Sequence, residues 1–355
     1  MRTRLRAILR VRVGDRARWA RRVSVAGLAA AWVLPALVFA QDAGSAASDA
    51  RARSVDPRSW LMRLHEAALQ RNYHGTLVVS TATSFSSSRV THFVDGDQQY
   101  ESVIALDGEA RSMLRHNDEV HTVWPRVRVA VVEQRDVRAS FPALMAGGEL
   151  RVLESYELRP LGIDRVAGYE AEVALLKARD ALRFSQRLWA ERQTGLLLRA
   201  DILAPNGQML ESAAFSELAL GGKPRPALVL EPLRHLDGYR VVRPAVLPTN
   251  LDNEGWRLAS LPAGFKQVQC AKRSLDPSGG PSAPVVLQSI YSDGLTHVSL
   301  FVEPFDPKRH QGEVVGSIGA THTLMTRRDD QWVTVMGDVP TETLKQFAAV
   351  LERKR

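Results

Sequence analysis

The sequence predicts an α+β protein with one large, curved, mostly antiparallel sheet and a smaller C-terminal α+β domain. Three observations lead to this prediction. Many short β-rich runs follow Gly75, and pairs that suit tight hairpins, such as Asp95-Gly96 and Asp107-Gly108, separate them. Strands joined by such turns are antiparallel, because parallel strands need long crossovers. A Gly/Pro-rich break at residues 221–226 then divides the chain.

The first 40 residues have the pattern of a secretory signal peptide. Nine arginines precede an uncharged apolar run, which ends in the small residue Ala40. We therefore expect residues 1–40 to be cleaved after Ala40, so that the mature protein works outside the cytoplasm. The alternative is a retained membrane anchor, but the run is short for a span and Pro35 interrupts it. The Arg21-Arg22 pair leaves the choice between Sec and twin-arginine export open.

This leader accounts for the net charge of the chain. The chain has 47 Lys and Arg against 39 Asp and Glu, and its first 40 residues hold nine of the arginines and one aspartate, which leaves 38 of each sign. The mature protein therefore gives no support for nucleic-acid binding, which needs a basic face. Cys270 is a single cysteine, so no internal disulfide can form. We expect it to be a small buried apolar residue; the alternatives are an intermolecular disulfide or a reactive thiol.

The large sheet domain is expected at residues 57–220, after a flexible tether at 41–56. Asp56 followed by Pro57 is typical of a helix start, and apolar residues at helical spacing from Trp60 to Leu69 predict an amphipathic helix over 57–71. The stretch 137–163 is expected to be irregular, with a helical turn at 143–145. The expected strands are Thr76–Thr81, Ser88–Val94, Gln98–Leu106, Ala110–His116, Val120–Trp124, Val127–Glu133, Tyr169–Ala178, Ala181–Ala190, Leu196–Leu203 and Met209–Leu218.

Residues 221–250 are expected to form a proline-stiffened linker, and residues 251–355 the small domain. A final helix is expected to begin near Pro340-Thr341, because apolar residues fall on one face after it. A loop is expected at Ser274–Pro284. One strand is expected at Phe265–Lys272. Two hairpins are also expected: the first pairs Val285–Tyr291 with Thr296–Val302, and the second pairs Thr321–Thr326 with Trp332–Met336.

No catalytic signature is present in the sequence. There is no nucleophile elbow, H-E-x-x-H motif, phosphate loop or dinucleotide fingerprint, so we expect neither an enzyme nor a cofactor. His92, His116 and His121 could meet around a metal on neighbouring strands, but such residues more often lie at a surface or edge, and no metal site is expected.

The apolar residues of the large sheet are numerous. Their simplest explanation is an ordinary core beneath a helix. The alternative is a hydrophobic concavity that accepts acyl chains or a peptide, with Trp124, Trp189 and Phe215 as candidate lining residues.

Residues 57–352 resemble the RseB/MucB family of periplasmic negative regulators of the extracytoplasmic stress sigma factor. The resemblance depends on the order and spacing of several short segments. These are Arg183-Phe184-Ser185 through Trp189 to Asp201, Gly255-Trp256-Arg257 with Leu261–Phe265, Ile290-Tyr291-Ser292-Asp293-Gly294-Leu295, and Trp332–Pro340.

The resemblance implies a fold and a function. The large domain would be similar to lipoprotein carriers, with a half-open β-barrel-like sheet and helices against its concave side. The protein would bind the periplasmic region of a membrane-spanning anti-sigma factor, shield it from proteolysis and so repress the envelope stress response. Lipopolysaccharide or lipoprotein acyl chains would relieve the block.

Two other classes of function compete with this interpretation. A periplasmic lipid or lipoprotein carrier shares the large domain but does not need the small one, and a secreted hydrolase lacks its motifs. The sequence leaves open whether the chain forms a homo-oligomer. The candidate partner-binding residues are those of one hairpin, whose alternative role is an ordinary tight turn: Tyr291, Ser292, Asp293, Gly294 and Leu295.

Overall fold

A computed structural model describes residues 56–134, 149–274, 285–310 and 312–354 of the chain. All of these residues belong to one compact unit. The predicted signal peptide at 1–40, all of the predicted tether except Asp56, and the predicted helical turn at 143–145 lie outside the described residues.

The larger of the sheets has twelve described strands and is not closed. Its bounds in chain order are β1 Tyr73–Thr81, β2 Phe85–Asp95, β3 Gln98–Ala105, β4 Ser112–His116, β5 Glu119–Trp124, β6 Val129–Gln134, β7 Tyr156–Val166, β8 Tyr169–Ala178, β9 Ser185–Glu191, β10 Leu197–Leu203, β11 Met209–Leu220 and β12 Arg240–Val242. The strand order across the sheet is β12-β6-β5-β4-β3-β2-β1-β11-β10-β9-β8-β7. Only the β12–β6 pair among the described strands of this sheet is parallel.

The smaller sheet has seven described strands in the order β13-β15-β16-β17-β20-β19-β18. Its strands are β13 Val246–Pro248, β15 Lys266–Ser274, β16 Val285–Ser292, β17 His297–Pro304, β18 Val314–Ile318, β19 Thr321–Arg328 and β20 Gln331–Gly337. A separate short pair joins β14 Trp256–Leu258 to β21 Leu351–Arg353.

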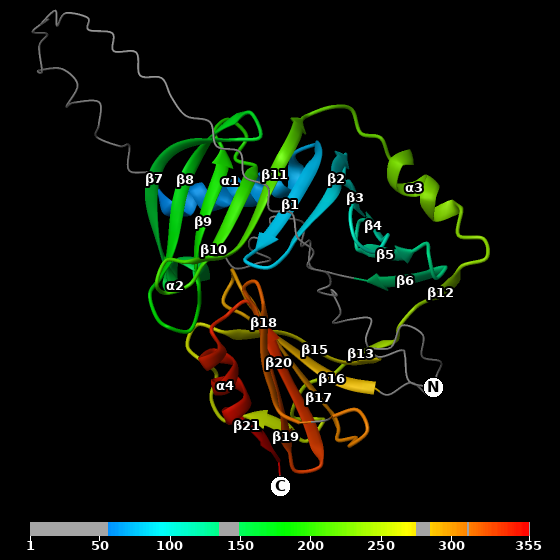
Figure 1. Cartoon of the computed structure of the whole chain (residues 1–355), viewed down its shortest axis with the longest axis vertical. Helices are drawn as coiled ribbons and strands as arrows, with labels where there is room; N and C mark the ends of the chain where they lie inside the picture. The colour runs from blue at the N-terminus through cyan, green and yellow to red at the C-terminus, as the bar shows by residue number, and fades with distance from the viewer. Residues whose placement is uncertain (1–55, 135–148, 275–284, 311, 355) are drawn as a thin grey trace, which may run out of the picture. The chain divides into compact units, whose positions relative to one another are not determined.

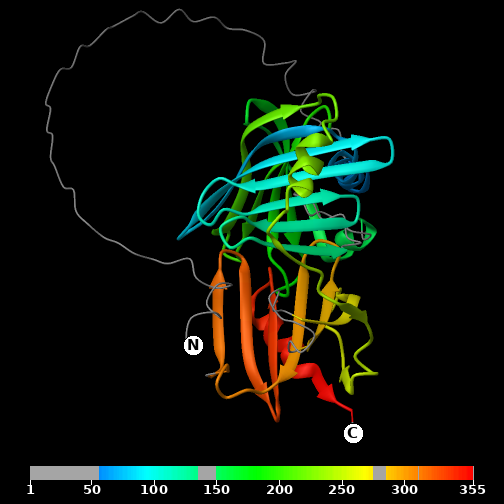
Figure 2. The same cartoon turned by 90° about the vertical axis from the view of Figure 1, so that its right-hand side faces the viewer.

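Helices cover both sheets. The helix α1, Pro57–Gln70, begins at Asp56, whose carboxylate accepts the Ser59 amide at 3.0 Å. It lies against β8–β10 (Figure 1) and buries Trp60, Leu61 and Leu64 there together with residues of α2, Glu149–Ser155. Figure 2 shows α3, Ala227–Arg234, across β2–β5, and α4, Thr341–Val350, packs on β19 and β20. The predicted fold class is therefore confirmed.

The predicted hairpins of both sheets are confirmed, with shifts of a few residues at strand ends. One element in the stretch that was expected to be irregular is a full strand: β7 runs over eleven residues, Tyr156–Val166. It was missed because Pro160 and Gly162 interrupt it at a bulge, and most of it is exposed, so its apolar residues do not alternate. The edge strand β18 was also missed.

The predicted linker at 221–250 contains regular structure. Prolines hid α3, which has Pro226 as its N-cap and Pro232 inside it, yet buries Val229 against Phe93 and Leu114 of the large sheet. After it, β12 pairs with β6 of the large sheet, and β13 pairs with β15 of the small sheet. The connection is therefore fixed to both sheets, and the exact domain boundaries remain a prediction.

Candidate functional site

A buried arginine joins the two sheets. Arg183 lies in the loop between β8 and β9, and its side chain is fully excluded from solvent. Its Nη1 donates to Asp293 Oδ2 at 2.6 Å, and its Nη2 donates to the Ala263 carbonyl oxygen at 2.6 Å, both in the small domain. Its Nε donates to Asp180 Oδ1 at 2.9 Å within its own loop. Each guanidinium nitrogen therefore has an acceptor, which a buried charge requires.

Asp293 is the other centre of this network, and it is also fully buried. It sits in the turn between β16 and β17, where Oδ1 accepts the amides of Leu295 and Thr296, both at 2.9 Å. Oδ2 accepts Arg183 and the hydroxyl of Tyr156, the latter at 3.1 Å. The carboxylate thus folds its own turn with one oxygen and holds the large sheet with the other.

Electrostatics keeps the two donors that reach Asp293 protonated. Burial, together with the charge of Asp293, raises the pKa of Tyr156 well above its ordinary value, so its hydroxyl stays a donor. Burial opposes the charge of Arg183, but the hydrogen bond to Asp180 and the charge of Asp293 hold its pKa above the ordinary value. The network is suited to fixing the two sheets together rather than to proton transfer.

Other contacts also join the two sheets. The Thr343 hydroxyl of α4 donates to the Leu182 carbonyl oxygen at 2.8 Å, and Arg273 donates to Glu133 across the sheets at 2.6 Å. Gly264 has a φ of +81°, and a Cβ there would lie 2.7 Å from Ser155 Oγ and 3.0 Å from Arg183 Nη1. We call this set of contacts the inter-sheet junction.

The candidate partner-binding hairpin lies at the inter-sheet junction. All five of its residues, Tyr291, Ser292, Asp293, Gly294 and Leu295, are buried within this chain. Leu295 packs in the core of α1 and the large sheet, and Tyr291 packs on Phe347 of α4. Contact between this hairpin and a partner would therefore require the junction to open, and its partner role remains a prediction.

The three candidate lining residues are not in one group. Trp189 and Phe215 are buried in the same cluster of the large sheet, but Trp124 is half-buried and lies on β5, far along the strand order. Trp189 donates to Asp164 Oδ2 at 2.9 Å, and Arg199 lies 4.4 Å from its ring centroid. The two buried aromatic residues are thus part of a filled core, and ligand lining remains a prediction.

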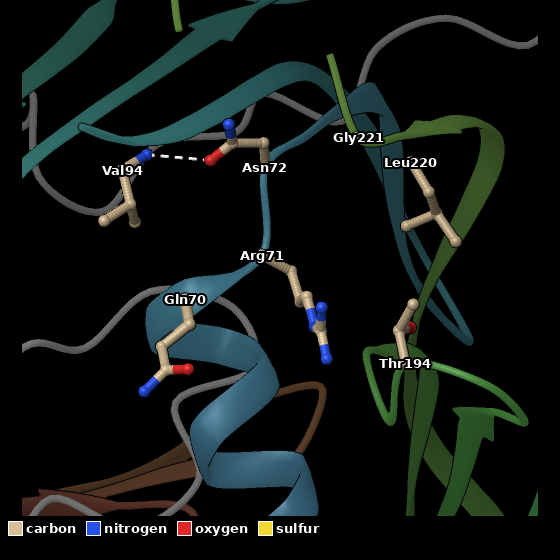
Figure 3. Close-up of a pocket in the computed structure, with 7 residues that line it drawn as sticks. All are labelled: Gln70, Arg71, Asn72, Val94, Thr194, Leu220 and Gly221. Carbon is tan, nitrogen blue, oxygen red and sulfur yellow. Dashed lines mark hydrogen bonds between the residues drawn. The ribbon is translucent and has the colours of Figure 1, made fainter. Parts of the chain in front are cut away.

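A cavity of about 340 Å³ opens where α1 ends and β1 begins (Figure 3). The Asn72 side chain shapes it, because Oδ1 accepts the Val94 amide at 2.9 Å and Nδ2 donates to the Gly222 carbonyl oxygen at 3.0 Å. Arg71 points toward Thr194 across the cavity (Figure 3). None of the candidate lining residues belongs to its lining, which is Gln70, Arg71, Asn72, Val94, Thr194, Leu220 and Gly221.

The three histidines considered above have separate partners. His92 bonds the Arg71 carbonyl oxygen, His116 bonds Gln98, and His121 bonds Glu119. In the part of the chain that the structure describes, no three His, Cys, Asp or Glu residues gather as they would around a metal ion.

No described helix is both long and apolar enough to span a bilayer. Cys270 is half-buried, and burial raises the pKa of its thiol.

Comparison with known families decides the relationship of this chain. The family model for the MucB/RseB N-terminal domain matches residues 56–234, and the one for the MucB/RseB C-terminal domain matches residues 250–352. The chain belongs to the MucB/RseB family. Its relatives include the sigma factor AlgU regulatory protein MucB of Pseudomonas aeruginosa, 31% identical over 83% of this chain and 90% of the relative. The sigma-E factor regulatory protein RseB of Escherichia coli is 24% identical over 81% and 88%.

Solved structures of family members have the same fold. The crystal structure of MucB in complex with MucA(peri) has a TM-score of 0.63 at 28% identity, covering 84% of this chain and all of that one. The crystal structure of MucB has a TM-score of 0.60 at 26% identity, covering 85% and 99%. The family resemblance that the sequence predicted is confirmed.

Sequence reasoning missed the central residue of the inter-sheet junction. Arg183 lies in a segment that carried the family resemblance, but its partner Asp293 is 110 positions away. A charged residue in a loop is ordinarily exposed. The Asp-Gly turn at Asp293 was visible as a hairpin signal, whereas its second role in holding Arg183 was not.

Proposed function

We infer that this protein binds the periplasmic segment of a membrane-spanning anti-sigma factor and shields it from proteolysis. Bound in this way, it represses the envelope stress response. The observation that carries the proposal is that a family member, MucB, has been solved in complex with MucA(peri), and the match covers 84% of this chain and all of that one. The relatives that match over most of this chain are named sigma factor regulatory proteins.

The site of action is the periplasm. The arginine-rich start followed by an apolar run ending in Ala40 supports export and cleavage there. Mass spectrometry of the periplasmic fraction would give a mature chain beginning at Gln41. A chain that keeps Met1, or one recovered only with membranes, would contradict this step.

Release by a lipid signal is the second half of the proposal. Lipopolysaccharide or a lipoprotein acyl chain, on entering the large domain, favours a conformation that binds the partner less well. Linkage requires reciprocity, so the partner must weaken amphiphile binding by the same factor. A tenfold shift corresponds to only about 1.4 kcal/mol of differential affinity. Because Trp189 and Phe215 are buried in a filled core, an amphiphile that contacts them must displace side chains.

A reconstituted protease assay tests both halves. The substrate is the purified periplasmic domain of the anti-sigma factor from the same organism, digested with and without this protein. Slower cleavage in its presence is expected, and adding lipopolysaccharide or an acylated peptide is expected to restore the rate. Absence of protection would remove the regulatory function. Protection that no amphiphile relieves would leave binding in place and remove the release step.

A further inference from the structure

The two sheets have four edge strands, and these strands differ in how they are protected against pairing with another chain. An edge strand exposes unpaired backbone groups, and proteins usually blunt it with charges, proline, bulges or short length. The edge strand β7 has Pro160, a bulge beside it, and charged residues on the same strand. The edge strands β12 and β13 have three residues each, and β13 ends in Pro248.

The fourth edge, β18, has none of these devices. Its sequence from Val314 to Ile318 is Val-Val-Gly-Ser-Ile, without charge or proline, and its ladder with β19 is regular over all five residues. Every residue of β18 is exposed, and the exposed fractions of Val315 and Ile318 are 57% and 60%. Among the described strands, none pairs with its outer side. The edge is therefore open and carries apolar side chains, and the strand is about 17 Å long.

The chain turns at both ends of β18, and the Gly319 end lies against the large sheet, where an added Cβ would clash with Glu211 and with Thr81 Cγ2. Gly312 and Gly319 flank β18 with positive φ angles of +141° and +59°, so the chain turns away from the strand direction on either side. At its centre, a Cβ built on Gly316 meets no described atom within 4 Å. The face of the sheet at Gly316 is therefore open to the side chain of an incoming strand.

Acidic side chains mark both ends of the edge. Glu313 precedes β18 and accepts the Thr326 hydroxyl. At the other end, Glu211 of β11 accepts the Ala320 amide at 3.4 Å, and Asp338 accepts the Thr321 hydroxyl. These donors are all neutral. Burial and the charge of Asp338 raise the pKa of Glu211, because both disfavour its ionised form.

The arginines on the neighbouring strand are already engaged within the chain. Arg327 lies over the ring of Phe305 at 4.0 Å, and Arg328 donates to the Ala348 carbonyl oxygen at 2.6 Å. The edge thus combines unpaired backbone groups, apolar side chains and acidic ends. That combination fits a β-forming apolar peptide flanked by basic residues.

We propose that β18 binds an extended segment of the protein partner by strand addition, with apolar residues along Val314–Ile318 and basic residues near Glu313 and Glu211. The backbone ladder supplies affinity, and the acidic ends set the position of the segment. This proposal rests on the proposed function, because it takes the anti-sigma factor's periplasmic domain as the source of the segment.

A matched pair of edge variants tests it. Ile318→Lys places a charge on β18, and Ile163→Lys places the same charge on β7, at residues that are 60% and 59% exposed. Binding of the purified periplasmic domain of the anti-sigma factor is measured by calorimetry, with thermal melting as the check on folding. We expect Ile318→Lys to weaken binding about tenfold or more, and Ile163→Lys to leave it unchanged.

The outcomes separate this proposal from the proposed function. If the wild-type protein does not bind the domain, the function fails. If it binds and both lysine variants bind equally well, the function stands and the role of β18 is overturned.

Hydrogen exchange gives a second readout. Strand addition is expected to protect alternate amides of β18, those that point away from β19, when the partner binds. Protection that instead depends on the concentration of this chain alone would assign the edge to a second copy and overturn the proposal.

Discussion

Arg183 and Asp293 form an ion pair from which water is fully excluded, with Nη1 and Oδ2 2.6 Å apart. Arg183 lies in a loop of the large sheet, and Asp293 lies in a turn of the small sheet. Each side-chain nitrogen of Arg183 and each carboxylate oxygen of Asp293 has a hydrogen-bond partner. The pair therefore fixes one arrangement of the inter-sheet junction. Its loss would leave a charge buried without compensation.

Replacing Arg183 is therefore expected to destabilise the protein strongly. Arg183→Ala leaves Asp293 without its counter-charge, and we expect the free energy of unfolding to fall by about 3–5 kcal/mol. Urea denaturation followed by circular dichroism measures it. Arg192→Ala is the control, because its ion pair with Glu170 is more than half exposed and is expected to contribute less than about 1 kcal/mol. Equal losses for the two variants would show that the buried pair has no special role.

The buried imidazole of His92 makes stability depend on pH. Its Nδ1 lies 2.8 Å from the Arg71 carbonyl oxygen and must carry a proton to donate to it. Its Nε2 lies 2.7 Å from the side-chain amide nitrogen of Gln99 and must keep a free lone pair to accept from it. The neutral ring satisfies both. Burial is the main cause that lowers the pKa of His92, and the charge of Arg115 lowers it further.

The sign of the effect follows from this shift. The unfolded chain, with an ordinary histidine pKa near 6.5, takes up the proton first as pH falls, so the free energy of unfolding decreases below that pH. Denaturation curves at about pH 7.5 and about pH 5 should show this decrease. It should be smaller in His92→Gln, although the pKa of His297 is also lowered by burial and contributes in the same direction. An unchanged decrease in the variant would assign the effect to other groups.

Gly264 is expected to tolerate no side chain. Gly264→Ala combines a positive φ with a Cβ only 2.7 Å from Ser155 Oγ, whereas Gly207→Ala has a similar φ of +84° and open space around it. Both variants pay the cost of the left-handed conformation, about 1 kcal/mol. We expect Gly264→Ala to lose distinctly more, measured as a larger drop in melting temperature. Similar melting temperatures would mean that the junction adjusts to the added methyl group.

The segment 251–355 is expected to fold when expressed alone. Its core is built from residues 251–351, and among the described residues of the large domain only the partly buried Leu182 packs against it. A cooperative thermal transition would be seen, at a lower temperature than in the whole chain, because Asp293 and Leu295 lose their partners. A longer fragment that keeps β13 should melt higher, because β13 pairs with β15. Random-coil circular dichroism from both fragments would show that the small domain depends on the large one.

Local signals made much of the fold predictable. The Ser292-Asp293-Gly294 turn and the apolar alternation on both sides were enough to place β16 and β17, which pair as expected. The same reasoning worked for α1, whose start is fixed by Asp56 and Pro57. These elements are determined by residues close together in the chain, so the sequence displays them.

Other features depend on contacts between distant residues. The helix α3 has three prolines around or inside it and forms because Val229 is buried on the large sheet. The strand β7 lacks alternation because it is an edge. The burial of Arg183 depends on Asp293, so no local pattern marks either residue as part of a site. Tertiary contacts decide these cases.

The connection between β12 and β13 limits how the two sheets can move. Only three residues, Arg243-Pro244-Ala245, separate two strands that are each hydrogen-bonded into a different sheet. Four Cα–Cα steps span at most about 15 Å, and proline restricts one of them further. If the inter-sheet junction opened, the sheets would remain tethered at this point and would swing about it as a hinge. Opening of the junction would therefore leave the joined ends of β12 and β13 within about 15 Å of each other.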